Sequence, residues 1–164
     1  MARARSDIAN TALRIFLQEM GSAYDEERGL QVYDGKKHFP EVRKFFGERC
    51  CYCGDALKSG RIAQDHLIAM NKTDLGLHAW GNVVPSCQDC NSIKQGTHWK
   101  DFLIQRAAGA AKERHKRVTD FIKHYGYAPK PSDLHEVAAA LYDEVGAIAM
   151  TLIDTKIKHV RAKL

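Results

Sequence analysis

The sequence predicts an α+β fold that is mostly helical, with a small core of two strands and one helix embedded in flanking α-helices. Two C-x-x-C pairs, at residues 50–53 and 87–90, enclose two short segments with strand-like patterns. On both sides apolar residues recur at helical spacing, and the last such pattern continues almost to the C-terminus. At 164 residues we expect a single domain with an N-terminal helical region (1–47), a core (48–96) and a C-terminal helical region (97–164).

The N-terminal region predicts two helices joined by a loop. Apolar residues follow a helical period over residues 8–20, and Gly21 is expected to end this helix. Residues 22–37 are polar and are expected to form a loop. Pro40 suits the first turn of a second, short helix, which Gly47 ends just before the first cysteine pair.

The core predicts two strands followed by a helix. Residues 61–69 alternate loosely between turn residues, as in a strand, and residues 73–81 resemble a long surface loop. A second strand is expected at residues 83–84, ended by Pro85, because proline cannot donate to a sheet ladder. A helix is expected over residues 87–94.

The C-terminal region predicts three helices. The first two cover residues 97–106 and 110–124, and Ser132 or Asp133 caps a longer one. Apolar residues of the long helix recur in steps of four and three at Leu134, Ala138, Leu141, Val145, Ile148 and Leu152. This spacing favours packing against another helix. That helix belongs either to the same chain or to a second copy, as in a homodimer through the helical regions.

Composition limits the class of protein. The chain is basic, with a formal net charge of +5, which is a modest bias toward a polyanion such as nucleic acid. No apolar run approaches the roughly 18 residues of a membrane span. The basic N-terminus is not followed by the apolar segment of a secretory signal. We therefore expect a cytoplasmic protein with no membrane partner.

The four paired cysteines predict a structural zinc site. Two i, i+3 pairs, Cys50 with Cys53 and Cys87 with Cys90, supply the four thiolates of a closed tetrahedral site. The other interpretation is a set of reduced core cysteines, but core packing does not require matched pairs. Cys51 is left over, and we expect it to be a small packed thiol.

Several motifs occur here in a characteristic order. C-x-x-C is followed by D-H-L-I at residues 65–68, G-N-V-V-P at residues 81–85 and C-x-x-C-N-x-x-K at residues 87–94. This series resembles the HNH endonucleases of the ββα-metal type that carry a structural zinc. The resemblance covers residues 50–96 and implies cleavage of phosphodiester bonds in double-stranded DNA. The helical flanks favour a compact restriction enzyme.

The resemblance implies a role for each polar residue of the core. His66 is the expected general base, since its ordinary pKa lies nearest neutrality and a loop carbonyl would fix its tautomer. Asp65 and Asn91 would hold a catalytic Mg²⁺ or Mn²⁺ ion through oxygen atoms. Asn82 would pin the loop through hydrogen bonds to the backbone. Asn91 departs from the strict family pattern, which has histidine there, and this favours loosely bound magnesium.

Other interpretations of these residues remain open. Neighbours on a strand point to opposite faces, so Asp65 and His66 need different partners. Lys94 is either a phosphate anchor or a solvated lysine, and His98 either an extra ligand or a capping residue. Several basic runs could follow a DNA backbone or be solvated helix faces; the largest is Lys112, Arg114, His115, Lys116 and Arg117. The alternative function is a non-catalytic zinc-stabilised module that binds DNA or a protein.

Overall fold

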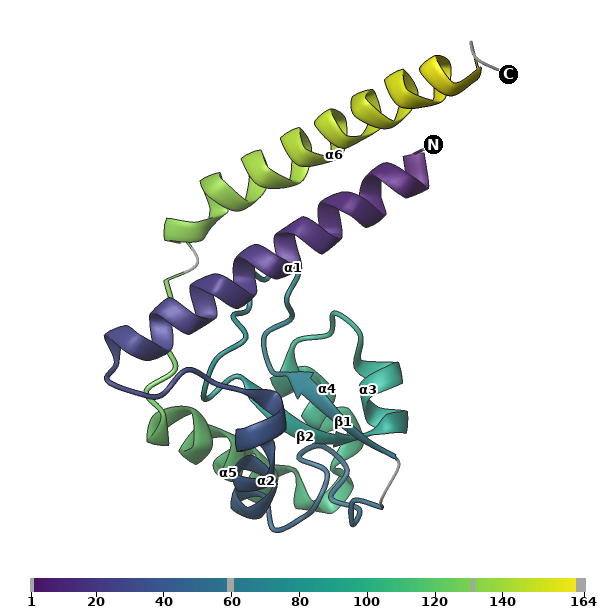
Figure 1. The fold of residues 1–164 in the computed structure, drawn as a ribbon. Helices are drawn as coiled ribbons and strands as arrows, with labels where there is room; N and C mark the ends of the chain where they lie inside the picture. Colours follow the sequence, from purple (N-terminus) through teal and green to yellow (C-terminus); the bar gives the residue numbers. More distant parts are fainter. Residues whose placement is uncertain (1, 59–60, 131, 162–164) are drawn as a thin grey trace.

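The computed structural model describes residues 2–58, 61–130 and 132–161. It has the α+β composition expected from the sequence, and its helices and strands are α1 (Ala2–Glu27), α2 (Gly35–Phe45), β1 (Ile62–His66), β2 (Val83–Cys87), α3 (Gln88–Lys94), α4 (Trp99–Arg106), a 3₁₀ turn η1 (Ala108–Ala110), α5 (Ala111–His124) and α6 (Ser132–Arg161). Figure 1 shows α1 and α6 side by side along one edge of the molecule, while the two strands and the shorter helices form a separate layer beneath them. The candidate site lies in that second layer.

Helix α1 continues past Gly21, so the prediction that this glycine ends the helix is wrong. An ideal Cβ built on Gly21 would overlap the carbonyl oxygen of His78 and lie 2.8 Å from its carbonyl carbon. The glycine therefore permits a loop to approach the helix closely, and it does not cap it. The helix ends at Glu27, and Gly29, at φ 72°, provides the left-handed turn that follows.

Helix α2 begins before Pro40, which also differs from the prediction. Asp34 is its N-cap, and its Oδ1 accepts hydrogen bonds from the backbone N–H groups of Lys36 (2.8 Å) and Lys37 (3.4 Å). Pro40 lies inside the helix and leaves one backbone carbonyl without its helical donor. Gly47, at φ 64°, follows the end of the helix, as predicted.

Strands β1 and β2 pair antiparallel, with Asp65 opposite Val84 and His66 opposite Val83. Pro85 lies within β2 and does not end it, contrary to the prediction. Leu67 N donates to Asn82 O at one end of the ladder, and Gln88 N donates to Arg61 O at the other. These two bonds show which residue pairs of the ladder are hydrogen-bonded and which are not. This alternation puts Pro85 at a position where the backbone nitrogen faces away from β1, so no ladder bond is lost.

The connection between the strands is buried, whereas the sequence suggested a surface loop. Leu75, Leu77 and Trp80 are each at most 5% exposed. The buried carboxylate of Asp25 in α1 accepts hydrogen bonds from the backbone N–H groups of Trp80 (3.2 Å) and Tyr33 (2.9 Å). These contacts attach the loop to α1 and thereby set the position of everything on it.

The remaining helices cover the core. Helix α3 follows β2 directly and contacts both strands. His98 is the N-cap of α4, and its Nδ1 accepts from the backbone N–H of Lys100 at 3.3 Å, so the capping interpretation of His98 is confirmed. Trp99 in α4 and Phe121 in α5 are buried in one hydrophobic cluster with the strands.

Helix α6 packs against α1 of the same chain, one of the two arrangements that its apolar spacing allows. Leu134 and Ala138 are buried with Leu13 and Leu17 of α1, and the Tyr142 hydroxyl lies 3.2 Å from Ser6 Oγ. Beyond these contacts α6 exposes apolar side chains, including Ile148 and Leu152. Among the described residues, no helix combines the length and apolar character needed to cross a bilayer.

Candidate functional site

The four paired cysteines lie together. Their sulfur atoms are all within 4.8 Å of one another, and the Cys53 and Cys87 sulfurs are 3.8 Å apart. Cys87 ends β2 and caps α3, its sulfur accepting from the Cys90 N–H at 3.4 Å. Cys50 and Cys53 lie on a tight turn that Gly54, at φ 81°, completes. This geometry can hold a structural metal such as zinc, which four thiolates would bind.

The pKa values of these cysteines determine whether the cluster releases protons when it binds a cation. Burial raises the pKa of Cys53, and it raises that of Cys90 to about 11. Burial also acts on Cys50, but backbone N–H groups directed at its sulfur outweigh it and hold its pKa below the ordinary value. Without a cation the thiols of Cys53 and Cys90 keep their protons at neutral pH, so metal binding here must release protons.

Cys51 lies outside the cluster and is buried in the hydrophobic core at 3% exposure, which confirms it as a packed thiol. Burial raises its pKa well above the ordinary value. Its backbone N–H donates to the carbonyl of Pro85 at 2.9 Å, on the edge of β2 that faces away from β1. The first cysteine turn is therefore hydrogen-bonded directly to the sheet.

Asp65 is held by one residue of that turn and by one residue of α3. Its Oδ2 accepts a hydrogen bond from the Tyr52 hydroxyl at 2.5 Å and lies 3.3 Å from Lys94 Nζ. Lys94 is 1% exposed, and its ammonium also donates to the carbonyl of His66 at 2.7 Å. Lys94 is therefore not a solvated lysine, and its ammonium is already engaged inside the protein.

The position of Lys94 was accessible from the sequence in one respect. Residues four apart share a helix face, so Lys94 has to lie on the same side of α3 as the buried Cys90. What no local pattern indicated was the partner, because Asp65 is distant along the chain. The buried ion pair links β1 to α3 at the centre of the candidate site.

His66 faces a different partner, as expected for neighbours on a strand. Its Nε2 lies 3.0 Å from Nδ1 of His78, a residue of the buried loop that the sequence analysis did not single out. Among the described residues this is the one hydrogen bond of the His66 ring, so an imidazole takes the place expected for a backbone carbonyl. Burial, then the nearby charges of His78, Arg14 and Lys94, lowers the pKa of His66 to about 3.

The two asparagines differ in how the structure uses them. Asn82 is fully buried; its Oδ1 accepts from Ile68 N at 2.8 Å, and its Nδ2 donates to the carbonyls of Ile68 (3.1 Å) and Leu77 (2.7 Å). These are the loop-pinning hydrogen bonds expected of it. Asn91 is half-buried in the first turn of α3, directly after Cys90. In the described part of the chain its side chain makes no hydrogen bond, so none joins it to Asp65.

Together, these residues form one unit of β1, β2 and α3 that carries a thiol cluster, a carboxylate, a neutral imidazole and an amide. An imidazole with so low a pKa is unprotonated at neutral pH and can accept a proton. No family model, curated protein or solved structure matches this chain.

Proposed function

We propose that this chain is a metal-dependent DNA endonuclease of the HNH type that hydrolyses phosphodiester bonds. The observation that carries the proposal is that Asp65 and His66 are adjacent at the end of β1, and each is held by its own partners. Tyr52 holds the carboxylate from the cysteine turn, and Lys94 holds it from α3. A carboxylate and a neutral imidazole on one rigid strand suit metal-assisted hydrolysis. A purely structural zinc module would require neither group.

In this mechanism His66 accepts the proton of the attacking water. The ring must be neutral and oriented, and both conditions are favoured here by burial and by the His78 ring at 3.0 Å. A base with so low a pKa is weak in the empty site. The negative charge of a bound phosphodiester stabilises the imidazolium that forms, so substrate raises the pKa of His66 toward the range useful for catalysis.

The oxygen atoms of Asp65 and Asn91 would hold the catalytic cation. Carboxylate and amide oxygens are hard donors, and their chemistry fits Mg²⁺ or Mn²⁺. When bound, such an ion supplies charge stabilisation for the phosphate and the departing 3′ oxygen. Because Lys94 Nζ lies 3.3 Å from Asp65 Oδ2, a divalent ion must share this carboxylate with the ammonium or displace it.

Zinc at the four cysteines would have a structural role. The two-stranded sheet buries little surface of its own, and structural zinc contributes about 10–16 kcal/mol of apparent binding free energy in small domains. The site would join the turn that carries Tyr52 to the start of α3. It would therefore fix the distance between the two groups that hold Asp65.

The test is cleavage of supercoiled plasmid by the zinc-loaded protein in Mg²⁺ or Mn²⁺. His66→Ala should abolish nicking while DNA binding and the thermal melt persist. His135→Ala, which removes an exposed histidine of α6, should leave all three unchanged. Equal nicking by His66→Ala and wild type, or no nicking by wild type on plasmid and phage DNA in either ion, would refute the proposal.

A second candidate function is a non-catalytic, zinc-held module that binds DNA. The ion pair between Lys94 and Asp65 favours it, because this pair satisfies the carboxylate without a second cation. Under this function, Asp65→Asn leaves DNA binding unchanged and no variant or wild-type protein cuts DNA in any divalent ion. Calorimetric titration with Mg²⁺ separates the two functions further, since only the nuclease requires a second, labile site.

A further inference from the structure

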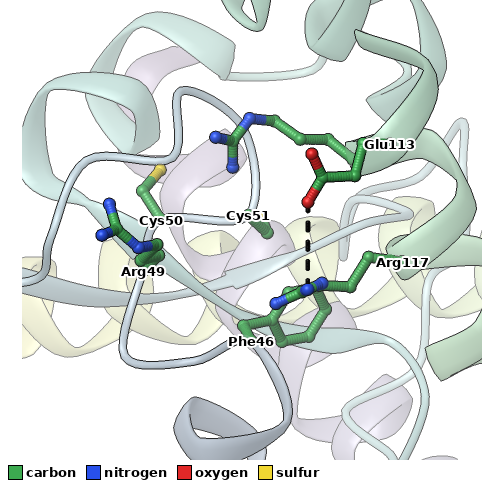
Figure 2. A pocket seen from close by; sticks show the side chains of 7 residues that line it. Phe46, Arg49, Cys50, Cys51, Glu113 and Arg117 are labelled. Carbon is green, nitrogen blue, oxygen red and sulfur yellow. Dashed lines mark ion pairs between the residues drawn. The ribbon is translucent and has the colours of Figure 1, made fainter. Parts of the chain in front are cut away.

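A small charged pocket lies beside the cysteine cluster, where α5 passes the first cysteine turn. It encloses about 220 Å³, and four of the side chains that line it are charged: Arg49, Glu113, Arg114 and Arg117. Figure 2 shows Glu113 and Arg117 facing each other on one side, with Phe46 beside Arg117, and Arg49 with Cys50 on the opposite side. Three guanidinium groups and one carboxylate leave the lining with a formal charge of +2.

The protein leaves most of the hydrogen-bonding capacity of these arginines unused. Arg49 donates from Nη1 to the carbonyl of Gly54 at 3.0 Å, and Arg117 lies 3.9 Å from Glu113. Arg114 Nε is buried and has no hydrogen-bond partner within the described residues. Buried donors in native proteins are nearly always paired, so the unpaired Nε marks Arg114 as a guanidinium that the protein itself does not fully satisfy.

The backbone makes room for this arrangement. Gly54 has φ 81°, and an ideal Cβ there would overlap the guanidinium of Arg114, so Arg114 lies flat against the first cysteine turn. Gly47, at φ 64°, has Arg117 Nη1 at 3.5 Å from its ideal Cβ position. The absence of a side chain at Gly54 therefore makes room for the Arg114 guanidinium beside the pocket, whereas the approach at Gly47 is an ordinary contact.

We propose that this pocket binds one phosphate group of the DNA backbone, an inference that takes its ligand from the proposed function. Guanidinium forks match phosphate oxygens in pairs, and a site with three of them selects a compact oxyanion. A pocket of about 220 Å³ is smaller than the usual range for organic ligands, and its lining is charged where such sites are mostly apolar. It accommodates a single phosphate better than a whole nucleotide.

A competing explanation is that the arginines neutralise the thiolates of the metal-loaded cysteine cluster, since Cys50 and Cys51 also line the pocket. The two explanations differ in what a charge-removing variant loses. If the arginines serve the cluster, Arg114→Gln lowers zinc content. If they serve a phosphate, zinc content is unchanged and DNA affinity falls.

The experiment measures binding of zinc-loaded protein to a short DNA duplex over a range of salt concentrations, without added divalent ions. Arg114→Gln and Arg49→Gln should each weaken binding and reduce the slope of log affinity against log salt, and the double variant should reduce it by about 0.9, the value for one phosphate contact. Arg161→Gln removes the same charge from the far end of α6 and should retain the wild-type slope. Binding of inorganic phosphate and the zinc content are measured on the same protein variants.

Each outcome decides the inference. A reduced slope with full zinc content supports it. An unchanged slope in both pocket variants or a loss of zinc overturns it, as does binding of inorganic phosphate at the pocket that leaves duplex binding unchanged. The last result would assign the pocket to free phosphate. The binding experiment involves no cleavage, so it can fail independently of the proposed function. If the pocket variants reduce the slope but wild-type protein does not cut DNA, only the nuclease is refuted. If wild-type protein cuts DNA but the pocket variants keep the wild-type slope, only the phosphate site is refuted.

Discussion

Lys94→Met tests whether a buried ion pair joins β1 to α3. The ammonium of Lys94 is 2.7 Å from the carbonyl of His66 and 3.3 Å from Asp65 Oδ2, and the lysine side chain is 1% exposed. Methionine keeps most of the chain length and apolar volume, so the substitution removes chiefly the charge and its hydrogen bonds. The carboxylate of Asp65, at 12% exposure, then retains the Tyr52 hydroxyl as its one donor among the residues that the structure describes.

Breaking a buried pair from one side costs about 3–5 kcal/mol, because the remaining charge is left uncompensated. Asp65 keeps one hydrogen bond and some solvent contact, so we expect the lower end, about 3 kcal/mol of unfolding free energy. Asp65→Asn in the same background should remove the uncompensated charge. The double variant is therefore expected to be more stable than the sum of the single changes by at least about 1 kcal/mol.

Urea unfolding of the zinc-loaded protein, followed by the fluorescence of the buried Trp80 and Trp99, measures these differences. Lys158→Met, which changes an exposed lysine of α6, is the control and should stay within about 0.5 kcal/mol of wild type. If Lys94→Met is as stable as this control, or if its effect is simply additive with Asp65→Asn, the ion pair does not hold the two elements together.

Three further outcomes are expected. Cys87→Ser should lose the bound metal and the cooperative melt, because the apparent free energy of zinc binding, about 10–16 kcal/mol, matches or exceeds the stability of most domains. A normal melt of a variant that contains no zinc would contradict a structural metal. Gly21→Ala should destabilise the protein by about 1–3 kcal/mol despite the better helix propensity of alanine, since its Cβ overlaps the His78 backbone. Gly146→Ala should cost less in the same thermal melt, because its nearest neighbours, Cγ and the carbonyl oxygen of Arg5, lie at 3.0 and 3.3 Å from the new Cβ. The pKa of His66 is about 3 in the folded protein and 6.5 in the unfolded chain, so the unfolded chain binds the proton first as the pH drops. The free energy of unfolding should therefore fall between pH 6.5 and pH 3, by up to about 1.4 kcal/mol per pH unit. Chemical unfolding of His66→Gln at a series of pH values should show a shallower loss, and an identical loss would show that His66 does not cause it.

The features that the sequence predicted well are set by neighbours along the chain. The C-x-x-C spacing brings two sulfurs together within each turn, and Cys87 with Cys90 also marks the start of α3. Strand alternation correctly gave Asp65 and His66 different partners. The start of α6 at Ser132 followed from the capping residues predicted there. The catalytic roles assigned to these residues remain predictions.

Where the sequence analysis was wrong, contacts between distant segments decided the outcome. A glycine such as Gly21 is typical of a helix end, but the loop at His78 packs against it and the helix continues. Pro85 would end an interior strand, but the register turns its nitrogen away from the ladder. The expected surface loop is buried because Asp25 of α1 accepts its backbone N–H groups.

The sequence alone determined that two cysteine turns flank an Asp-His pair and that helices enclose this core, because these properties depend on spacings of a few residues. Only the tertiary structure decided that His78 meets the His66 ring, that Lys94 is withdrawn from solvent to pair with Asp65, and that three arginines converge beside the cysteine cluster. The physical reason is that burial and charge pairing depend on which segments meet in space. No local pattern records a partner that lies many residues away.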